Sequence, residues 1–185
     1  MRKVHVFNHV SLDGYFTDAN GDMSWAHKHD EEWTAFAGAN AGGEGELLFG
    51  RVTYEMMAAF WPTPQAARML PEVAAGMNAM RKMVFSRTLD HVAWQNTTLL
   101  KGDLASEVRR LKAQAGPDMV ILGSGSLVSQ LTQARLVDEY QIVVNPVVVG
   151  RGRTLFETVE GRVHLRLTKT RPFTNGNVVL WYEPA

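Results

Sequence analysis

Short apolar runs alternate with segments of helical periodicity along most of the chain, and this alternation constrains the fold more than any other feature. One helical segment places Leu104, Val108 and Leu111 on one face after Asp103, a suitable N-cap, and ends before Gly116. Alternating strands and helices favour parallel crossovers, with helices on both faces of the sheet. We expect strands at residues 4–10, 46–49, 82–85, 98–100, 119–122 and 140–149.

The C-terminal part follows a different pattern. Val163, Leu165 and Leu167 alternate with polar residues, Asn175-Gly176 is typical of a hairpin turn, and an apolar run returns at 178–182. We therefore expect an α/β fold in which helices flank a mainly parallel central sheet that ends in an antiparallel C-terminal ribbon. Without a repeat or a linker, residues 1–185 are expected to form one domain. A loop is expected at 61–65 and a helix near Pro71.

Composition excludes several classes of function. Lys plus Arg and Asp plus Glu both number 19, so the net charge is zero and nucleic acid is not an expected partner. The absence of cysteine excludes disulfides, thiolate catalysis and cysteine metal sites. His27 and His29 precede Asp30, but no second histidine cluster supports them, and we expect no metal. The N-terminus is too short and polar for a signal peptide, and no run could span a membrane, so we expect a cytoplasmic protein without a membrane partner.

Three strand-to-helix junctions have residues suited to phosphate. Gly123-Ser124-Gly125-Ser126 follows an apolar run and opens a helical segment, although Val128 breaks the dinucleotide fingerprint G-x-G-x-x-G. Gly50 and Arg51 stand at a second junction, with Val52, Met56 and Phe60 repeating at helical spacing after them. Ser86 and Arg87 end a third strand. Free amides at a helix start, a hydroxyl group and a guanidinium group are all donors to phosphate oxygens.

These junctions are expected to converge, because parallel sheets bind ligands outside the carboxyl ends of their strands. Two junctions could hold a diphosphate, and Ser86 with Arg87 could hold a ribose 2′-phosphate, which together describe NADPH. No acidic residue stands where it would favour NADH. The alternative for each junction alone is an ordinary glycine turn or an ordinary surface arginine.

Taken together, these segments resemble the dihydrofolate-reductase-like superfamily. Residues 50–55 (GRVTYE) resemble its G-R-x-T-[WY]-E motif, residues 84–87 (VFSR) its V-x-S-R motif, and residues 121–126 its I-G-G-G turn. Residues 11–14 (SLDG), 136–139 (LVDE) and 150–152 (GRG) resemble the branch that contains the reductase domain of bacterial riboflavin biosynthesis. The resemblance covers the whole chain. It implies an NADPH site formed by Gly50, Arg51, Thr53, Ser86, Arg87, Gly123, Ser124, Gly125 and Ser126.

The resemblance also implies residues for the substrate side. A carboxylate near the start of the first helix assists protonation in dihydrofolate reductases, and Asp30 matches it, with Trp25 before it and Trp33 after it. Asp30 is the expected catalytic residue, although a helix N-cap is its alternative role. Asp13, Trp25 and Trp33 are expected to contact substrate, and for Asp13 ordinary turn chemistry is the alternative. The threonine that partners the carboxylate is absent from residues 140–144, and 61–80 is longer than the family's connection, which disfavours folate.

The sequence thus predicts an NADPH-dependent oxidoreductase that transfers hydride to a small nitrogen heterocycle of pteridine or aminopyrimidine type. The alternatives are a true dihydrofolate reductase and an NADPH-binding sensor without turnover. The apolar run at 142–149 and the C-terminal ribbon predict a homodimer, which the resemblance also implies.

Overall fold

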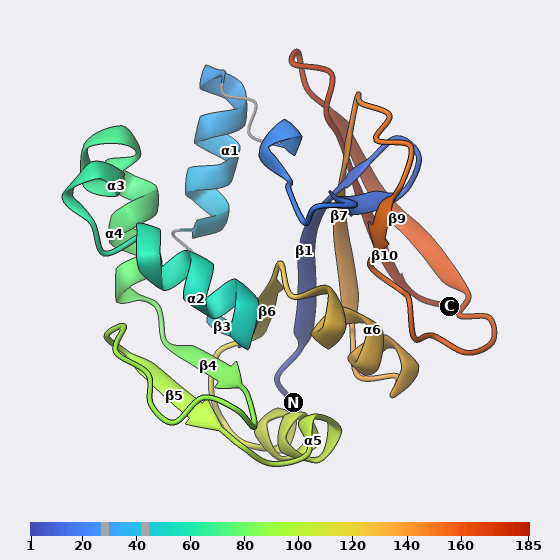
Figure 1. The fold of residues 1–185 in the computed structure, drawn as a ribbon. Coiled ribbons are helices and arrows are strands. Elements are labelled where there is room, and N and C mark those ends of the chain that lie inside the picture. The colour runs from blue at the N-terminus through green and yellow to red at the C-terminus, as the bar shows by residue number, and fades with distance from the viewer. Residues whose placement is uncertain (27–29, 42–44) are drawn as a thin grey trace.

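The computed structural model describes residues 1–26, 30–41 and 45–185. Its centre is an eight-stranded sheet of order β5-β4-β3-β6-β1-β7-β10-β9 (Figure 1). The five pairings from β5 to β7 are parallel, and β10 pairs antiparallel with β7 and β9. The strands are β1 (Val4–Ser11), β3 (Glu46–Gly50), β4 (Lys82–Phe85), β5 (Thr97–Leu100), β6 (Met119–Leu122), β7 (Glu139–Asn145), β9 (Leu165–Pro172) and β10 (Val178–Pro184). The expected mainly parallel α/β fold with an antiparallel C-terminal ribbon is confirmed.

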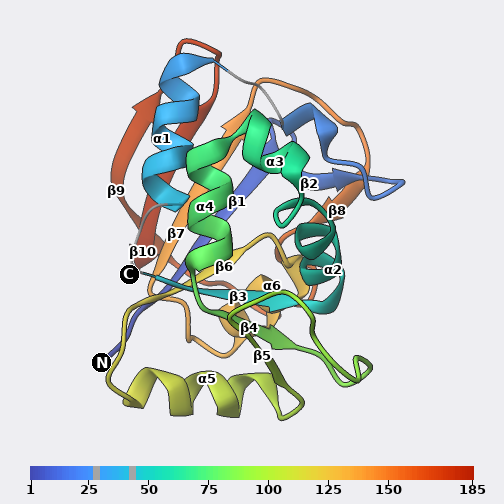
Figure 2. The same cartoon turned by 90° about the vertical axis from the view of Figure 1, so that its left-hand side faces the viewer.

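Helices cover both faces of this sheet. α1 (Glu31–Ala41), α2 (Arg51–Phe60), α3 (Pro64–Met69) and α4 (Pro71–Ala79) lie on one side, and Figure 2 shows α1 and α4 side by side in front of the strands. α5 (Leu104–Ala113) and α6 (Gly125–Gln133) lie on the other side and pack on each other. A short helical turn, η1 (Ser24–Ala26), precedes α1, and β2 (Tyr15–Asp18) pairs with β8 (Gly152–Thr154) in a separate ribbon. None of the helices in the described ranges is long and apolar enough to cross a membrane.

Alternation along β1 divides the molecule into two interiors. Val4 and Val6 face the α5–α6 side, where the largest core cluster is formed. His5, Phe7 and His9 face the α1 side, and all three line a cavity there. A period of two in the sequence therefore sends apolar residues to the core and mixed residues to the site.

Several element boundaries differ from the sequence expectation. β7 ends at Asn145 instead of reaching Val149, because Pro146 follows and has no amide to donate to a neighbouring strand; the Asn145 side chain donates to the carbonyl groups of Val10 and Val143. The segment 61–65 is only partly a loop, since Thr63 caps the amide of Ala66 and α3 begins at Pro64. β9 begins after Val163, and β2 and β8 were not expected, because strands of three or four residues carry too little periodicity.

Candidate active site

A cavity of about 1160 Å³ lies on the α1 side of the sheet. It exceeds the usual volume of a pocket for one small ligand, so it has room for two. Its lining falls into two parts. The polar lobe, at the carboxyl ends of β3, β4 and β6, consists of Gly50, Arg51, Thr53, Ser86, Arg87, Asp103, Gly123, Ser124, Gly125, Ser126 and Gln130. The apolar lobe, between α1, α4 and the sheet, consists of Trp33, Met57, Phe60, Trp61, Met69, Leu70, Val73, Met77, Met80 and Leu122.

Hydrogen bonds hold the first two strand-to-helix junctions against each other. The Ser124 hydroxyl oxygen accepts from the Gly50 amide at 2.8 Å, and the Ser124 amide donates to the Thr53 hydroxyl oxygen at 3.0 Å. Ser124 has a φ of 56° and Gly123 a φ of 67°, so the chain passes through two left-handed residues before α6. This tight turn brings the start of α6 beside the start of α2, as the sequence predicted from separate motifs.

Both of those helices begin without a side-chain cap. Gly50 and Ser124 make no capping hydrogen bond, whereas the Asp103 carboxylate caps α5 by accepting from Ser106 and the Asp30 carboxylate accepts from Trp33 at the start of α1. An uncapped helix start keeps donor amides and the positive end of the helix dipole available to an anion. Because both starts line the polar lobe, this lobe fits the diphosphate of a dinucleotide cofactor.

The glycines of the turn have a packing role of their own. A Cβ at Gly125 would lie 2.7 Å from the ring of Phe16, and one at Gly123 would lie 3.0 Å from Thr53. A side chain at Gly125 would therefore displace Phe16, on β2, before it met a ligand. No local sequence signal links Phe16 to this turn, because the contact joins residues more than a hundred positions apart.

The charged and hydroxyl residues predicted for the cofactor all line the polar lobe. Arg51 is exposed and donates to Glu55 at 2.9 Å. The Ser86 hydroxyl oxygen accepts from the amides of Thr88 and Leu89, which fixes the turn after β4. Arg87 lies near Asp103, whose pKa is lowered first by its hydrogen bonds with Ser106 and then by Arg87. Ser86 and Arg87 thus stand together at the third junction, where a phosphate monoester would be bound.

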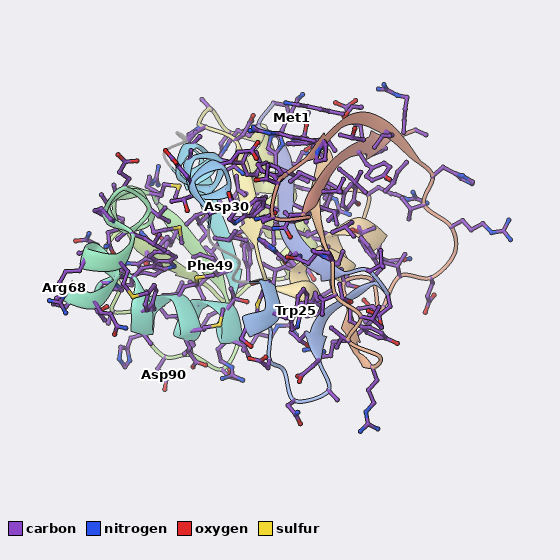
Figure 3. The ribbon with its side chains drawn as sticks, turned by 90° about the horizontal axis from the view of Figure 1, so that it is seen from above. Met1, Trp25, Asp30, Phe49, Arg68 and Asp90 are labelled. Atoms are coloured by element: carbon purple, nitrogen blue, oxygen red, sulfur yellow. The ribbon has the colours of Figure 1, made fainter. Side chains whose placement is uncertain are left out.

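Asp30, Trp25 and Trp33 differ in whether they line the cavity. Trp33 lines the cavity and is 5 % exposed, whereas Trp25 and Asp30 are not among the described residues that line it. Figure 3 shows Trp25 on the η1 turn and Asp30 at the start of α1. One Asp30 oxygen accepts from the Trp33 amide at 2.7 Å, which is the N-cap role. The other oxygen is buried, and no described residue bonds to it.

Asp13 is bound within its own loop. Its carboxylate accepts from the Ser11 hydroxyl group and from the amides of Val149 and Gly150. Asp13 is not among the described residues that line the cavity. The Ser11 hydrogen bond is the largest cause that lowers the pKa of Asp13 to about 2, with the two amides adding to it. Through these hydrogen bonds Asp13 fastens the loop after β1 to the segment after β7.

Other polar residues reach the cavity that the sequence did not single out for it. Asn8 is buried and donates to the Gly123 carbonyl oxygen at 3.1 Å, so it supports the turn from β1. Glu139 and Gln141, on β7, line the cavity beneath α1. His5 lies between Glu139, at 3.1 Å, and Asp118, at 3.4 Å. The period-two pattern of β1 could have pointed to His5 and His9, because both share a face with Phe7.

A metal site finds no support in the described residues, among which no group of three or more His, Asp or Glu side chains is placed to hold an ion. His27 and His29 lie outside the residues that the structure describes.

Comparisons with known proteins agree on one family. The profile of the RibD C-terminal domain matches residues 2–179. The uncharacterized protein YyaP of Bacillus subtilis is 29% identical over 175 residues, which cover 94% of this chain and 90% of that protein. A putative riboflavin biosynthesis protein from Shewanella sp. PV-4 superposes with a TM-score of 0.74 at 22% identity, over 99% of both chains.

A second solved structure supports the fold at a greater distance. Dihydrofolate reductase from Enterococcus faecalis, solved in complex with NADP(H) and RAB-propyl, superposes with a TM-score of 0.65 at 15% identity. The match covers 98% of this chain and 96% of that one. The profile match spans nearly the whole chain. The chain belongs to the RibD C-terminal domain family and has the dihydrofolate-reductase-like fold.

Proposed function

We propose that the protein is an NADPH-dependent reductase that transfers hydride from the nicotinamide to a ring or imine carbon of a small nitrogen heterocycle. The observation that carries the proposal is the meeting of two uncapped helix starts and the Ser86-Arg87 turn at one lobe of a cavity with room for two ligands. The family and the solved relatives named as reductases support the same class of reaction. Bound NADPH would supply the hydride.

The protein's own residues would bind and orient the partners. The amides of α2 and α6 would hold the diphosphate, and Arg87 with Ser86 would hold the 2′-phosphate. Trp33 would pack against the flat ring of the substrate. Asp30, with one oxygen on the Trp33 amide, lies outside the described cavity lining, and its second oxygen would relay a proton toward the ring nitrogen through an ordered water. In the alternative dihydrofolate reductase, the substrate would be dihydrofolate itself.

The test is NADPH oxidation, followed at 340 nm, with pterins, aminopyrimidine ribosides and dihydrofolate as substrates. We expect turnover with a pterin or an aminopyrimidine. NADPH binding without turnover of any heterocycle would instead indicate a sensor. The N-cap role of Asp30 is consistent with a sensor, because it gives this carboxylate a structural function. The absence of NADPH binding would contradict both.

We also propose a homodimer through the C-terminal half of the chain. β9 is an edge strand with nearly all of its side chains exposed, and Leu165, Leu167 and Val148 are apolar and open to solvent. Exposed edges and apolar surface favour pairing with a second copy. Light scattering at high micromolar concentration should give twice the mass of the chain, and Leu167→Lys should shift it toward the monomer. A wild-type protein that scatters as a monomer would contradict the dimer.

A further inference from the structure

The apolar lobe contains no cation in the described residues that line it. The Lys and Arg side chains described along the whole cavity are Arg51, Arg87 and Arg153. Arg51 is paired with Glu55 at 2.9 Å and stands at the start of α2. Arg153 is paired with Glu157 at 3.0 Å and lies over the Phe16 ring, beside the turn before α6. None of the three is among the residues of the apolar lobe.

The basic residues nearest to the apolar lobe are turned away from it. Arg68 projects outward from α3 in Figure 3 and does not line the cavity. Arg81 is bound to Glu46 at 2.9 Å, and its side chain is 76% exposed. Lys82 is 1% exposed, and its ammonium group donates to the carbonyl oxygens of Asn78, Met80 and Gln95. None of these three cations is in a position to pair with an anion in the lobe.

The lining that remains is apolar and adaptable. Five methionines from α2, α3, α4 and the residue after α4 line the cavity: Met56, Met57, Met69, Met77 and Met80. Phe60, Trp61, Leu70 and Val73 line it as well. Methionine side chains adjust to irregular apolar partners. Glu139, which lies 3.1 Å from His5, also lines the cavity and adds no positive charge to it. A phosphate or carboxylate buried here would find no Lys or Arg side chain to pair with among the described residues, which is costly.

We infer that the substrate carries an uncharged, apolar substituent on its heterocycle, and that the apolar lobe selects against phosphorylated or carboxylated side chains. This inference rests on the proposed function and narrows its substrate class. Burial of an apolar substituent against methionine and aromatic side chains stabilises the complex in proportion to the area removed from water. The same lobe would leave an anionic tail desolvated and unpaired.

The test compares two probes that differ by one carboxylate: 6-benzyl-7,8-dihydropterin and its 4-carboxybenzyl counterpart. Each is titrated by calorimetry into the protein with and without saturating NADP⁺. We expect the benzyl probe to bind on the order of tenfold more tightly or better, because the carboxylate loses its hydration without gaining a partner. Equal or tighter binding of the carboxybenzyl probe would overturn the inference, and so would failure of both probes to bind.

A matched pair of variants locates the preference. Met69 lines the lobe and is 60% exposed, so Met69→Lys adds a cation at the rim with little risk to the fold. Ala67 is exposed on the same helix outside the described cavity lining, and Ala67→Lys is the control. Met69→Lys should narrow or reverse the preference, and Ala67→Lys should not. If both variants shift it equally, the lobe does not set the preference. Failure of NADP⁺ alone to bind contradicts only the proposed function.

Discussion

The two lobes of the cavity are built by different means. The polar lobe is built mainly from backbone amides and polar side chains at the starts of α2 and α6 and in the turn after β4, and each of these is a continuous segment of the sequence. The apolar lobe collects side chains from α1, α2, α3, α4 and β6, which no local motif connects. A ligand held by local backbone geometry can be anticipated from sequence, whereas a ligand held by packed side chains cannot. The polar lobe can therefore be anticipated from local motifs, and the apolar lobe becomes visible only in the folded chain.

The largest expected effect separates the chemistry from the cofactor lobe. Asp30→Asn keeps an oxygen that can accept from the Trp33 amide, so the start of α1 should hold. We expect NADPH binding to stay normal and turnover to fall on the order of a hundredfold, because the carboxyl group that would relay the proton is lost. Steady-state kinetics over pH, with Asp13→Asn as the control, measure this. Wild-type turnover in Asp30→Asn would remove the catalytic role.

The next effect sharpens the cofactor assignment within the polar lobe. Arg87→Ala should weaken NADPH binding by on the order of 1.5–3 kcal/mol and leave NADH binding nearly unchanged, because only NADPH carries the 2′-phosphate. Fluorescence titrations with both cofactors give the ratio. Arg51→Ala is the matched control, since Arg51 is also exposed but already paired with Glu55. An equal loss for both cofactors in Arg87→Ala would contradict the 2′-phosphate role.

A smaller effect tests the helix starts without disturbing Phe16. Ser126 is exposed in the first turn of α6, so Ser126→Asp places a negative charge at the positive end of the helix dipole. The variant should be more stable by about 0.3–1 kcal/mol, while NADPH binding weakens on the order of tenfold through repulsion of the diphosphate. Thermal melts measure the gain in stability, and NADPH titrations measure the loss of affinity. Ser126→Asn, which adds no charge, should change neither much, and unchanged affinity in Ser126→Asp would return the turn to a structural role.

The smallest effect concerns the wall of the apolar lobe. Burial lowers the pKa of Lys82, which fastens the end of α4 to β4, to about 8 from its ordinary 10.5. Between about pH 8 and 10.5 the unfolded chain then binds more protons than the folded one, so stability should rise with pH across that window. The gain should be on the order of 1 kcal/mol. Urea unfolding of wild type and Lys82→Met at pH 8 and 10 isolates it, and equal pH slopes would refute it.

Much of the fold followed from periodicity. Runs of β-type residues predicted the parallel strands, and Asp103 predicted the start of α5, because both signals are local. The sequence failed to predict elements and site residues that depend on contacts between distant parts of the chain. β2 pairs with β8, which lies more than a hundred positions away in the chain. In the site, Phe16 and Asn8 escaped prediction because their link to the turn before α6 spans more than a hundred residues.

By itself, the sequence determined the parallel sheet, the C-terminal ribbon and the three phosphate-type junctions, since each depends on residues close together in the chain. Tertiary structure alone decided which side chains meet. In the folded chain the Ser124 hydroxyl group accepts from the Gly50 amide, and the Asp13 carboxylate accepts from the Gly150 amide. Arg68, Arg81 and Lys82 do not line the apolar lobe. Strand propensity and turn geometry are properties of neighbouring residues. The charge of a cavity is set by which distant side chains point into it, and that orientation is fixed only when the helices pack.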